Sequence, residues 1–600
     1  MPHIRLAISQ FRPAKGEYDA NVARIGAVIT QAAQLDPKPD LVVFPETATS
    51  GYFVEGGVKE LAVTAGTLAR DLAAGYQGAA IDVVVGFYER FQNHIYNSAL
   101  YVTLDTNKKP AVRHVHRKVF LPTYGVFDEE RFVDRGQDGV RSFETGWGGT
   151  AAILICEDAW HSLAATVAAL EGAQLLIVPS ASPARGTGED DDCKGEALPA
   201  SVVRWERIVR GIAEEHGVFV ALANLVGFEG GKGFPGASAV IDPTGRIIAR
   251  GPLFEEALLT ADIDLDALTT ARSDSPLLAD LQSALPVLIK GLGMRDARGG
   301  MRVAFDPATN GDASRIPHPA SRVDIVTPEL DKSDPLAIDP ELTRRWLVSF
   351  LKDEVVRRRN FQKGIVGLSG GVDSALTAFL AAEALGKENV IGVRLPYRTS
   401  SPESLAHAQL VIDKLGIPAL TIDISDAVDG YLKQVGDADP HRLGNVMARE
   451  RMIVLFDLSA KHKALPLGTS NKSERLLGYF TWHGDDAPPV NPLGDLFKTQ
   501  VWALARHVGV PEEIVGKPAT ADLIKGQTDE GDLGVSYLKA DRILFHLIRG
   551  EEPQGGGFTK EEVELVRRRL DSTHWKRRLP TVAVLSQTAI GEFYLRPVDY

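Results

Sequence analysis

Ser369-Gly370-Gly371-Val372-Asp373-Ser374 is the stretch of this chain that says most about its fold and chemistry. The apolar run 364–368 before it predicts a buried strand, and 375–385 after it predicts a helix. Two glycines between a strand and a helix let the backbone approach an anion closely, and the helix start favours a phosphate there. The commoner phosphate loop, Gly-x-x-x-x-Gly-Lys followed by Ser or Thr, needs a lysine that is missing here. Asp373 instead offers a carboxylate to a metal ion that bridges phosphates. A plain glycine turn between a strand and a helix would not explain this aspartate.

The composition bounds the class of protein. The chain has 600 residues, too many for one core, so we expect about two to four domains. A hydrophobic content of 44% with 24% charged residues is ordinary for a soluble globular protein, and a net charge of -13 argues against nucleic acid as a partner. We find neither an apolar run near twenty residues nor a secretion signal, so no membrane association is expected. With two cysteines only, Cys156 and Cys193, the natural expectation is a cytoplasmic protein without structural disulfides.

Apolar runs rich in β-formers alternate with helical patterns in two separate regions, which predicts a layered α/β fold in each. The expected strands lie at 4–8, 41–44, 83–87, 99–102, 151–155, 175–178, 218–223 and 261–264, and then at 365–368, 390–395 and 420–424. Expected helices include 21–34, 202–215 and 340–358. Prolines and glycines break any long period between 273 and 339, which indicates an extended linker with some local helix. We therefore expect domains at 1–272 and 340–600, joined by a linker at 273–339.

Three chemically reactive side chains stand at or just past predicted strand ends in the first region. These are Glu46, Lys118 and Cys156. A thiolate is a strong nucleophile, but a free cysteine is mostly protonated at pH 7. A buried carboxylate could take the thiol proton and return it to a leaving amine, and a lysine could stabilise an oxyanion. A lone cysteine is more often a small core residue than a catalytic nucleophile. The surrounding motifs decide between these two interpretations of Cys156.

Those motifs resemble the nitrilase, or carbon–nitrogen hydrolase, superfamily over roughly residues 1–270. They are Phe-Pro-Glu at 44–46, Lys-x-Phe-Leu-Pro at 118–122 and Cys-Glu-Asp-x-Trp at 156–160. The resemblance implies an α-β-β-α sandwich that hydrolyses a carboxamide through a thioester, with Glu46, Lys118 and Cys156 as the triad. It also implies that Glu129 holds the lysine and that Tyr124 and Ser182 contact glutamine. The basic residue that would complete the glutamine site stays open between Arg185 and Lys194.

The glycine loop resembles that of ATP pyrophosphatases, which adenylate a carboxyl or carbonyl oxygen. Further segments resemble NAD synthetases and imply a doubly wound parallel sheet; they are 444–449, 468–474, 477–481, 484–485, 494–501 and 526–530. The implied contacts to ATP are Gly367, Leu368, Ser369, Gly370, Gly371, Val372, Asp373, Ser374, Arg394 and Thr469. The implied contacts to deamido-NAD or the phosphates are Asn445, Glu474, Asp485, Lys498 and Lys576. The implied Mg²⁺ ligands are Asp373 and Glu474, with Thr520 nearby.

Together the two halves resemble the glutamine-dependent NAD(+) synthetases along nearly the whole chain. The resemblance implies that ammonia released from glutamine amidates adenylated deamido-NAD, with ATP as co-substrate and Mg²⁺ as cofactor. Because ammonium has no lone pair, we expect an enclosed passage for neutral ammonia. The family resemblance also implies a homodimer through the synthetase domain or a larger homo-oligomer. Another glutamine- or ammonia-fed ATP pyrophosphatase, such as a tRNA-modifying enzyme, is the alternative, and the acidic charge counts against tRNA.

Overall fold

The computed structural model describes residues 3–54, 57–124, 126–186, 198–291, 334–436, 438–520, 528–553 and 557–577. Cys193, Lys194 and most of the predicted linker lie outside these residues. The chain forms two compact units, whose described parts are residues 3–185 with 200–291, and residues 334–577. The predicted domain boundaries at 272 and 340 remain a prediction.

The first unit contains two six-stranded sheets and a short hairpin. The first sheet has the order β14 (Ala257–Asp264), β1 (His3–Gln10), β2 (Leu41–Val43), β3 (Ile81–Phe91), β4 (His94–Leu104), β5 (Ala111–Arg117). The second has the order β13 (Ile247–Arg250), β12 (Ala239–Ile241), β9 (Phe219–Asn224), β8 (Leu175–Ser180), β7 (Thr150–Ile153), β6 (Ser142–Glu144). The hairpin pairs β10 (Val226–Glu229) with β11 (Lys232–Pro235). The helices are α1 (Tyr18–Ala33), α2 (Val58–Leu61), α3 (Ala65–Ala74), α4 (Ser162–Leu170), α5 (Ala200–His216), α6 (Asp266–Asp274) and α7 (Leu277–Gly291), with 3-10 turns η2 (Glu129–Arg131) and η3 (Cys156–Trp160).

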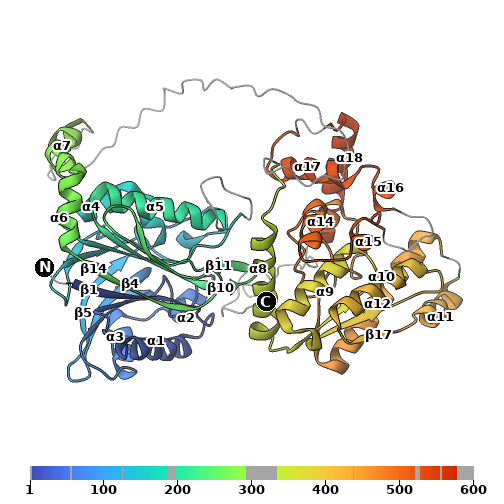
Figure 1. Ribbon diagram of the computed structural model, residues 1–600, viewed down its shortest axis with the longest axis horizontal. Coiled ribbons are helices and arrows are strands. Elements are labelled where there is room, and N and C mark those ends of the chain that lie inside the picture. Colours follow the sequence, from blue (N-terminus) through green and yellow to red (C-terminus); the bar gives the residue numbers. More distant parts are fainter. Residues whose placement is uncertain are drawn as a thin grey trace. The chain divides into compact units, whose positions relative to one another are not determined.

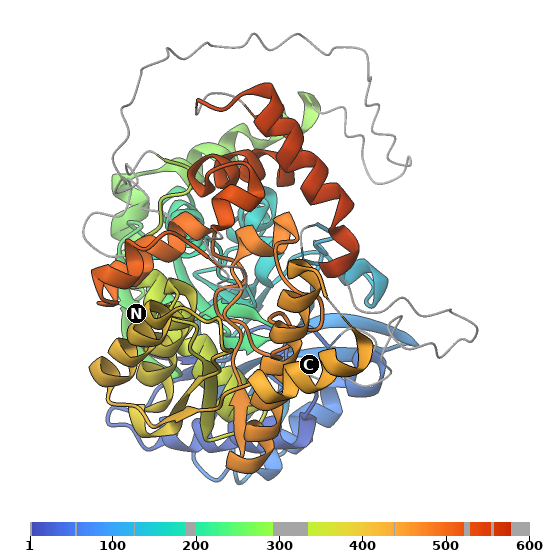
Figure 2. The ribbon, with the colours of Figure 1, turned by 90° about the vertical axis from the view of Figure 1, so that its right-hand side faces the viewer.

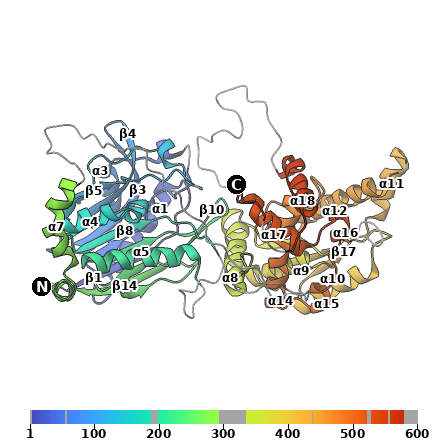
Figure 3. The ribbon, with the colours of Figure 1, turned by 90° about the horizontal axis from the view of Figure 1, so that it is seen from above.

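Alternation along the strands decides which layer each side chain enters. In β1, Leu6 and Ile8 belong to the core that also contains the second sheet, α4 and α5. Ala7, on the opposite face, packs into the core formed with α1 and α3. Figure 1 shows α4 and α5 on one side of the strands and α1 and α3 on the other, and in Figure 3 α4 and α5 run in front of the strands. The predicted α-β-β-α sandwich is therefore confirmed.

The second unit is built on a four-stranded parallel sheet with the order β17 (Ala419–Thr421), β16 (Val390–Arg394), β15 (Lys363–Gly367), β18 (Ala464–Pro466). Its helices are α8 (Pro340–Leu351), continued by a π-helical turn η4 (Lys352–Arg358), α9 (Val372–Leu385), α10 (Pro402–Leu415), α11 (Ser425–Val435), α12 (Pro440–His462), α13 (Lys472–Leu477), α14 (Lys498–His507), α15 (Glu512–Val515), α16 (Asp529–Leu533), α17 (Tyr537–Ile548) and α18 (Lys560–Ser572), with 3-10 turns η5 (Lys387–Asn389) and η6 (His574–Arg577).

Neighbouring residues of β15 again face different layers. Val366 packs with α8, α9 and α14, whereas Ile365 packs with α11 and α12. Helices therefore cover both faces of the parallel sheet (Figure 2), and the predicted doubly wound fold is confirmed.

The predicted strands of the first unit correspond to β1, β2, β3, β4, β7, β8, β9 and β14. The strands that were not predicted, β5, β6 and β10 to β13, are short or mixed in polarity. Part of the predicted linker is regular, because α7 occupies Leu277–Gly291 with Pro286 inside it. None of the helices in the described part of the chain combines the length and apolar character that a membrane crossing requires.

Candidate active sites

The first candidate site gathers side chains from the ends of three strands in the first unit. Glu46 follows β2, Lys118 directly follows β5, and Cys156 opens η3 after β7. The Nζ atom of Lys118 lies 2.7 Å from Glu46 Oε1 and 2.7 Å from Glu129 Oε1. Cys156 lies close enough for Glu46 and Lys118 to influence its ionisation. The four residues that the sequence predicted for catalysis are thus brought together.

All four side chains are buried, and further groups fix their orientation. Their exposed fractions are 0% for Glu46 and Lys118 and 7% for Glu129 and Cys156. One oxygen of Glu46 also accepts a hydrogen bond from Asn97 Nδ2 at 2.8 Å, and the other accepts one from the Ala181 amide at 2.8 Å. The Tyr52 hydroxyl donates to Glu129, and the Ser180 hydroxyl donates to Cys156 Sγ at 3.4 Å. Sequence reasoning missed these partners, since only the fold places them here.

The electrostatics of this group suit a thiol that needs a base. Burial, and then the neighbouring Glu46, raise the pKa of the Cys156 thiol well above its ordinary value. Burial alone would lower the pKa of Lys118, but Glu129 and Glu46 raise it well above the ordinary value. Burial raises the pKa of Glu129 to about 7, although Lys118 opposes the rise. The thiol therefore rests protonated until a base acts on it, while the lysine stays cationic and can stabilise an oxyanion.

The turn that carries Cys156 is held in an unusual backbone conformation. Cys156 has φ 45°, in the left-handed region that few residues with a Cβ adopt. Buried Asp158 accepts hydrogen bonds from the Ile155 amide at 3.1 Å and from His116 Nε2 at 2.8 Å. It also accepts hydrogen bonds from the amides of residues 119 and 120, at 3.0 and 2.9 Å. One carboxylate thus ties the Cys156 turn to the segment that carries Lys118.

The residues predicted to contact glutamine lie near the same turn. Tyr124 is 56% exposed, and its hydroxyl donates to both carboxylate oxygens of Glu157 at 2.9 Å. Ser182 is partly buried, two residues after Ser180. Arg185 is exposed, whereas Lys194 lies outside the described residues, so the basic partner of glutamine stays open. Glu157 was not among the predicted contacts, although its place directly after Cys156 could have suggested it.

The second candidate site is a cavity of about 700 Å³ in the second unit. Most of the predicted nucleotide contacts line it: Gly367, Leu368, Ser369, Gly371, Val372, Asp373, Ser374, Asn445, Thr469, Glu474, Asp485, Lys498 and Thr520. Three predicted contacts do not line it. Gly370 is buried, Arg394 donates to Gln409, and Lys576 donates to the carbonyl oxygens of Gly478 and Phe480 at 2.9 and 3.0 Å. Lys576 thus holds a segment that lines the cavity, and direct contact of Arg394 or Lys576 with substrate stays a prediction.

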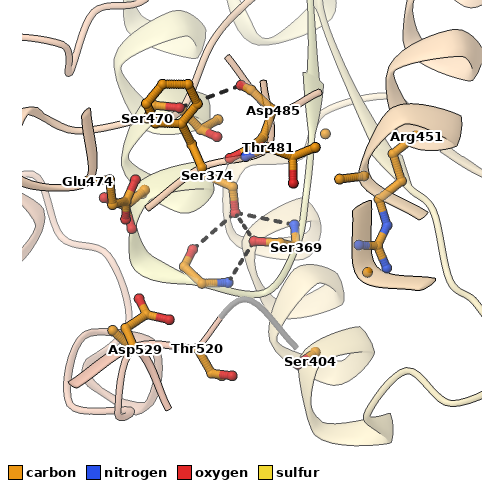
Figure 4. Close-up of a pocket in the computed structure, with 18 of the residues that line it drawn as sticks. Ser369, Ser374, Ser404, Arg451, Ser470, Glu474, Thr481, Asp485, Thr520 and Asp529 are labelled. Carbon is orange, nitrogen blue, oxygen red and sulfur yellow. Dashed lines mark hydrogen bonds between the residues drawn. The ribbon is translucent and has the colours of Figure 1, made fainter. Parts of the chain in front are cut away.

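Hydrogen bonds within the glycine loop hold its shape, and no side chain of the loop caps the start of α9. The Ser374 hydroxyl donates to the Gly371 carbonyl oxygen at 3.0 Å and lies 3.1 Å from the Ser369 hydroxyl, as Figure 4 shows. The residue before α9 is Gly371, which has no side chain to cap the first amides of the helix. Those amides, at a positive helix end, suit a phosphate.

Gly370 supplies a sharp test of this loop. Its φ is +81°, and a Cβ built there would lie 2.2 Å from the Ser404 carbonyl oxygen. We expect Gly370→Ala to distort the loop and to raise the KM for ATP by at least roughly tenfold, since both backbone strain and a clash oppose the native loop. Gly430→Ala is the matched control, because Gly430 lies on α11, does not line the cavity, and a Cβ built there meets no atom within 4 Å. Equal ATP kinetics for the two variants would contradict this account of the loop.

A buried lysine stands among carboxylates at the edge of the cavity. Lys498 Nζ lies 2.5 Å from Asp373 Oδ2 and 3.3 Å from Glu474 Oε1, and the lysine is 2% exposed. Burial would lower the pKa of Lys498, but Asp373, Glu474 and Asp529 raise it above the ordinary value. Burial, and then Asp373, raise the pKa of Glu474 to about 8. The group is a compact charge cluster beside the phosphate loop.

The donor set fits Mg²⁺ bound together with ATP. No group of three or more His, Cys, Asp or Glu side chains able to hold a metal ion occurs among the described residues. Mg²⁺ commonly uses one or two carboxylates with substrate phosphates and water, so Asp373 and Glu474 beside the phosphate loop suffice. Asn471 Nδ2 donates to Asp373 Oδ1 at 2.9 Å and keeps the carboxylate in place.

Two predicted deamido-NAD contacts meet at Thr481. The Thr481 amide donates to Asp485 Oδ1 at 2.8 Å, and its hydroxyl donates to Asn445 Oδ1 at 3.0 Å. Burial raises the pKa of Asp485 to about 6. Asn445 lies on α12, so this corner of the cavity joins α12 to the loop after α13. Asp529 also lines the cavity and was missed, although it stands in a motif that the sequence had singled out.

Both halves of the chain match known protein families. The family model for carbon-nitrogen hydrolases matches residues 5–273, and that for NAD synthases matches residues 344–580. A glutamine-dependent NAD(+) synthetase of Thermotoga maritima is 30% identical over 100% of this chain and 99% of its own. An NH(3)-dependent NAD(+) synthetase of Trichlorobacter lovleyi is 49% identical over 44% of this chain and 98% of its own. The solved structure of a glutamine-dependent NAD+ synthetase from Acinetobacter baumannii, in complex with ADP, covers 100% of this chain and 99% of its own, with 25% identity and a TM-score of 0.69.

Proposed function

The chain belongs to the glutamine-dependent NAD(+) synthetases, and we propose that its two sites perform the two halves of one amidation. In this proposal glutamine, ATP and deamido-NAD are converted into glutamate, AMP, pyrophosphate and NAD. The observation that carries it is the presence, on one chain, of a buried Glu46-Lys118-Cys156 group and of a phosphate loop beside Lys498. The first set of residues suits amide hydrolysis, and the second suits nucleotide activation.

At the first site Cys156 attacks the side-chain amide carbon of glutamine. Glu46 takes the thiol proton, and Lys118 stabilises the negative oxygen of the tetrahedral intermediate. Glu46 then delivers the proton to the leaving nitrogen, so the carbon–nitrogen bond breaks and ammonia leaves a thioester on Cys156. Water, deprotonated by Glu46, hydrolyses the thioester to glutamate and restores the thiol. Glu129 and Tyr52 keep Lys118 in place throughout.

At the second site the carboxylate of deamido-NAD attacks the α-phosphorus of ATP. Pyrophosphate leaves, and an acyl adenylate forms. In this proposal the amides at the start of α9 and the ammonium group of Lys498 hold the phosphates and neutralise the charge on departing pyrophosphate. Mg²⁺ held by Asp373 and Glu474, with Thr520 beside the cavity, would supply further charge neutralisation. Neutral ammonia then attacks the acyl carbon and displaces AMP, which leaves the carboxamide of NAD.

The product set tests this function. The wild-type protein with deamido-NAD, ATP, Mg²⁺ and glutamine should form NAD, AMP, pyrophosphate and glutamate, and NAD formation should stop when ATP is omitted. Chromatography of the reaction mixture measures all four products. Amidation of another carboxylate in preference to deamido-NAD would favour a different ATP pyrophosphatase. Because the synthetase half is 49% identical to an NH(3)-dependent synthetase over 98% of that protein, we also expect ammonium to replace glutamine.

We further propose that the chain forms a homodimer through its synthetase unit and acts in the cytoplasm. Four large apolar side chains of α11 and α12 are exposed: Tyr431 50%, Val435 45%, Ile453 62% and Phe456 43%. The two helices contact each other, and exposed apolar side chains are typical of an interaction surface. A buried nucleophilic thiol also suits a reducing compartment.

The dimer gives a direct mass measurement. We expect Ile453→Glu to shift the protein from dimer to monomer in analytical ultracentrifugation, because it places a charge in an apolar contact. Leu163→Glu is the control, since Leu163 is 69% exposed on α4 of the first unit and should leave the mass unchanged. A monomeric wild type, or an unchanged mass for Ile453→Glu, would reject this interface.

A further inference from the structure

Helix α14 begins without a cap of its own. The residue before its first turn is Phe497, whose side chain cannot accept a hydrogen bond from a backbone amide. The first two amides are satisfied from elsewhere. The Lys498 amide donates to Ser473 Oγ at 2.8 Å, and the Thr499 amide donates to Asp541 Oδ2 at 3.0 Å. Asp541 lies on α17, so a residue of another helix completes the start of α14.

The same carboxylate also holds α13. Its Oδ1 atom accepts a hydrogen bond from the Ser473 hydroxyl at 2.5 Å, and its Oδ2 atom accepts a second one from the Thr499 hydroxyl at 2.9 Å. Asp541 and Ser473 are both fully buried. Anions are stabilised at helix N-termini, so one buried charge serves the first turns of two helices at once. Burial raises the pKa of Asp541 to about 6, although the hydrogen bonds that the carboxylate accepts oppose this rise. A pKa of about 6 leaves the carboxyl group mostly charged at neutral pH.

These two turns carry the charged groups of the second site. Glu474 directly follows Ser473, and Lys498 directly precedes Thr499. Lys498 Nζ in turn lies 2.5 Å from Asp373 at the phosphate loop. Asp541 itself does not line the cavity.

We propose that Asp541 is a positioning residue of the synthetase site, which sets where Lys498 and Glu474 stand toward Asp373 and the bound nucleotide. This inference rests on the proposed function of the second site. A long lysine side chain is placed accurately only when its backbone is fixed, and here the backbone is fixed by Ser473 and Asp541. Residues of this kind tune a site through the groups that touch the substrate.

Asp541→Asn tests the proposal, because it keeps the size of the side chain but removes its charge and one acceptor oxygen. With ammonium as nitrogen source, we expect kcat for NAD formation to fall roughly tenfold. We also expect the Kd for ATP, measured by calorimetry, to rise about tenfold at a stoichiometry near one. A merely structural role would lower the stoichiometry and leave Kd unchanged, since unfolded protein does not bind. Glutamine hydrolysis at the first site should stay at the wild-type rate.

Asp334→Asn is the matched control, because Asp334 Oδ2 pairs at 2.7 Å with Arg542, the next residue of α17. It should leave kcat and the Kd for ATP unchanged.

If Asp541→Asn does not fold, Ser473→Ala removes the link to α13 and the acceptor of the Lys498 amide while the carboxylate stays, and the same losses are expected. A wild type that makes no NAD would overturn the proposed function. A wild type that makes NAD, with Asp541→Asn (or Ser473→Ala in its place) matching its Kd and kcat, would overturn the positioning role alone.

Discussion

Cys156→Ala is expected to abolish NAD formation from glutamine and to leave NAD formation from ammonium intact. Cys156 carries the only thiol in the described part of the first unit, and a thioester requires a thiol, so the glutamine-dependent rate should fall by on the order of 10⁴-fold or more. The synthetase site does not need the thiol when ammonia is supplied, so its rate with ammonium should stay within about twofold of wild type. Two steady-state assays, one for each nitrogen source, measure both effects on the same protein preparation.

Cys193→Ala is the natural control for this variant, because it removes the other cysteine of the chain. We expect it to retain both activities. Loss of the ammonium-dependent rate in Cys156→Ala would mean that the two sites are not separable. Retention of the glutamine-dependent rate would mean that Cys156 is not the nucleophile.

Lys498→Met should have the opposite pattern, with loss of NAD formation from both nitrogen sources and retention of glutamine hydrolysis. Methionine preserves the apolar stem of the side chain, but it removes the positive charge that faces Asp373, Glu474 and Asp529. Loss of one preorganised charge-stabilising group commonly costs on the order of 10²–10³-fold in rate. NAD formation with ammonium and glutamate release from glutamine are the two measurements.

Lys472→Met provides a lysine control close by in the sequence. Lys472 Nζ pairs at 2.8 Å with Asp495, which is 97% exposed, and exposed ion pairs contribute little. Its rates should match wild type. If Lys498→Met also made NAD at the wild-type rate, the charge cluster around Asp373 would have no part in the chemistry.

Local pattern was enough to predict an α/β fold in each of the two regions, and it singled out Glu46, Lys118 and Cys156 as candidate reactive residues. Strands such as 4–8 and 365–368 are apolar runs bounded by polar segments, and the fold keeps them as β1 and β15. Glu46, Lys118 and Cys156 could be selected because they follow strands, and strand ends in α/β folds converge. The hairpin strands β10 and β11 were not predicted, because each four-residue segment contains a glycine and a charged residue among its apolar positions.

The rest of the sites depends on tertiary contacts that no local pattern carries. Asn97 reaches Glu46 across 51 residues of sequence, and Asp541 reaches Ser473 across 68. Arg394 is the last residue of β16, but its side chain donates to Gln409 on α10, a partner that strand position alone does not predict. Glu157 was next to the predicted nucleophile, yet its partner Tyr124 lies 33 residues away.

The central claim is that nitrogen taken from glutamine at Cys156 becomes the carboxamide nitrogen of NAD made at the phosphate loop. Wild-type protein should be given deamido-NAD, ATP, Mg²⁺ and amide-¹⁵N glutamine, with an equal concentration of unlabelled ammonium present. Mass spectrometry of the NAD then reports the origin of its nitrogen. The account predicts NAD that carries ¹⁵N well above its share of the free ammonium pool, with one AMP formed for each NAD. No NAD from either nitrogen source, or NAD whose label only equals that of the free pool, would contradict it.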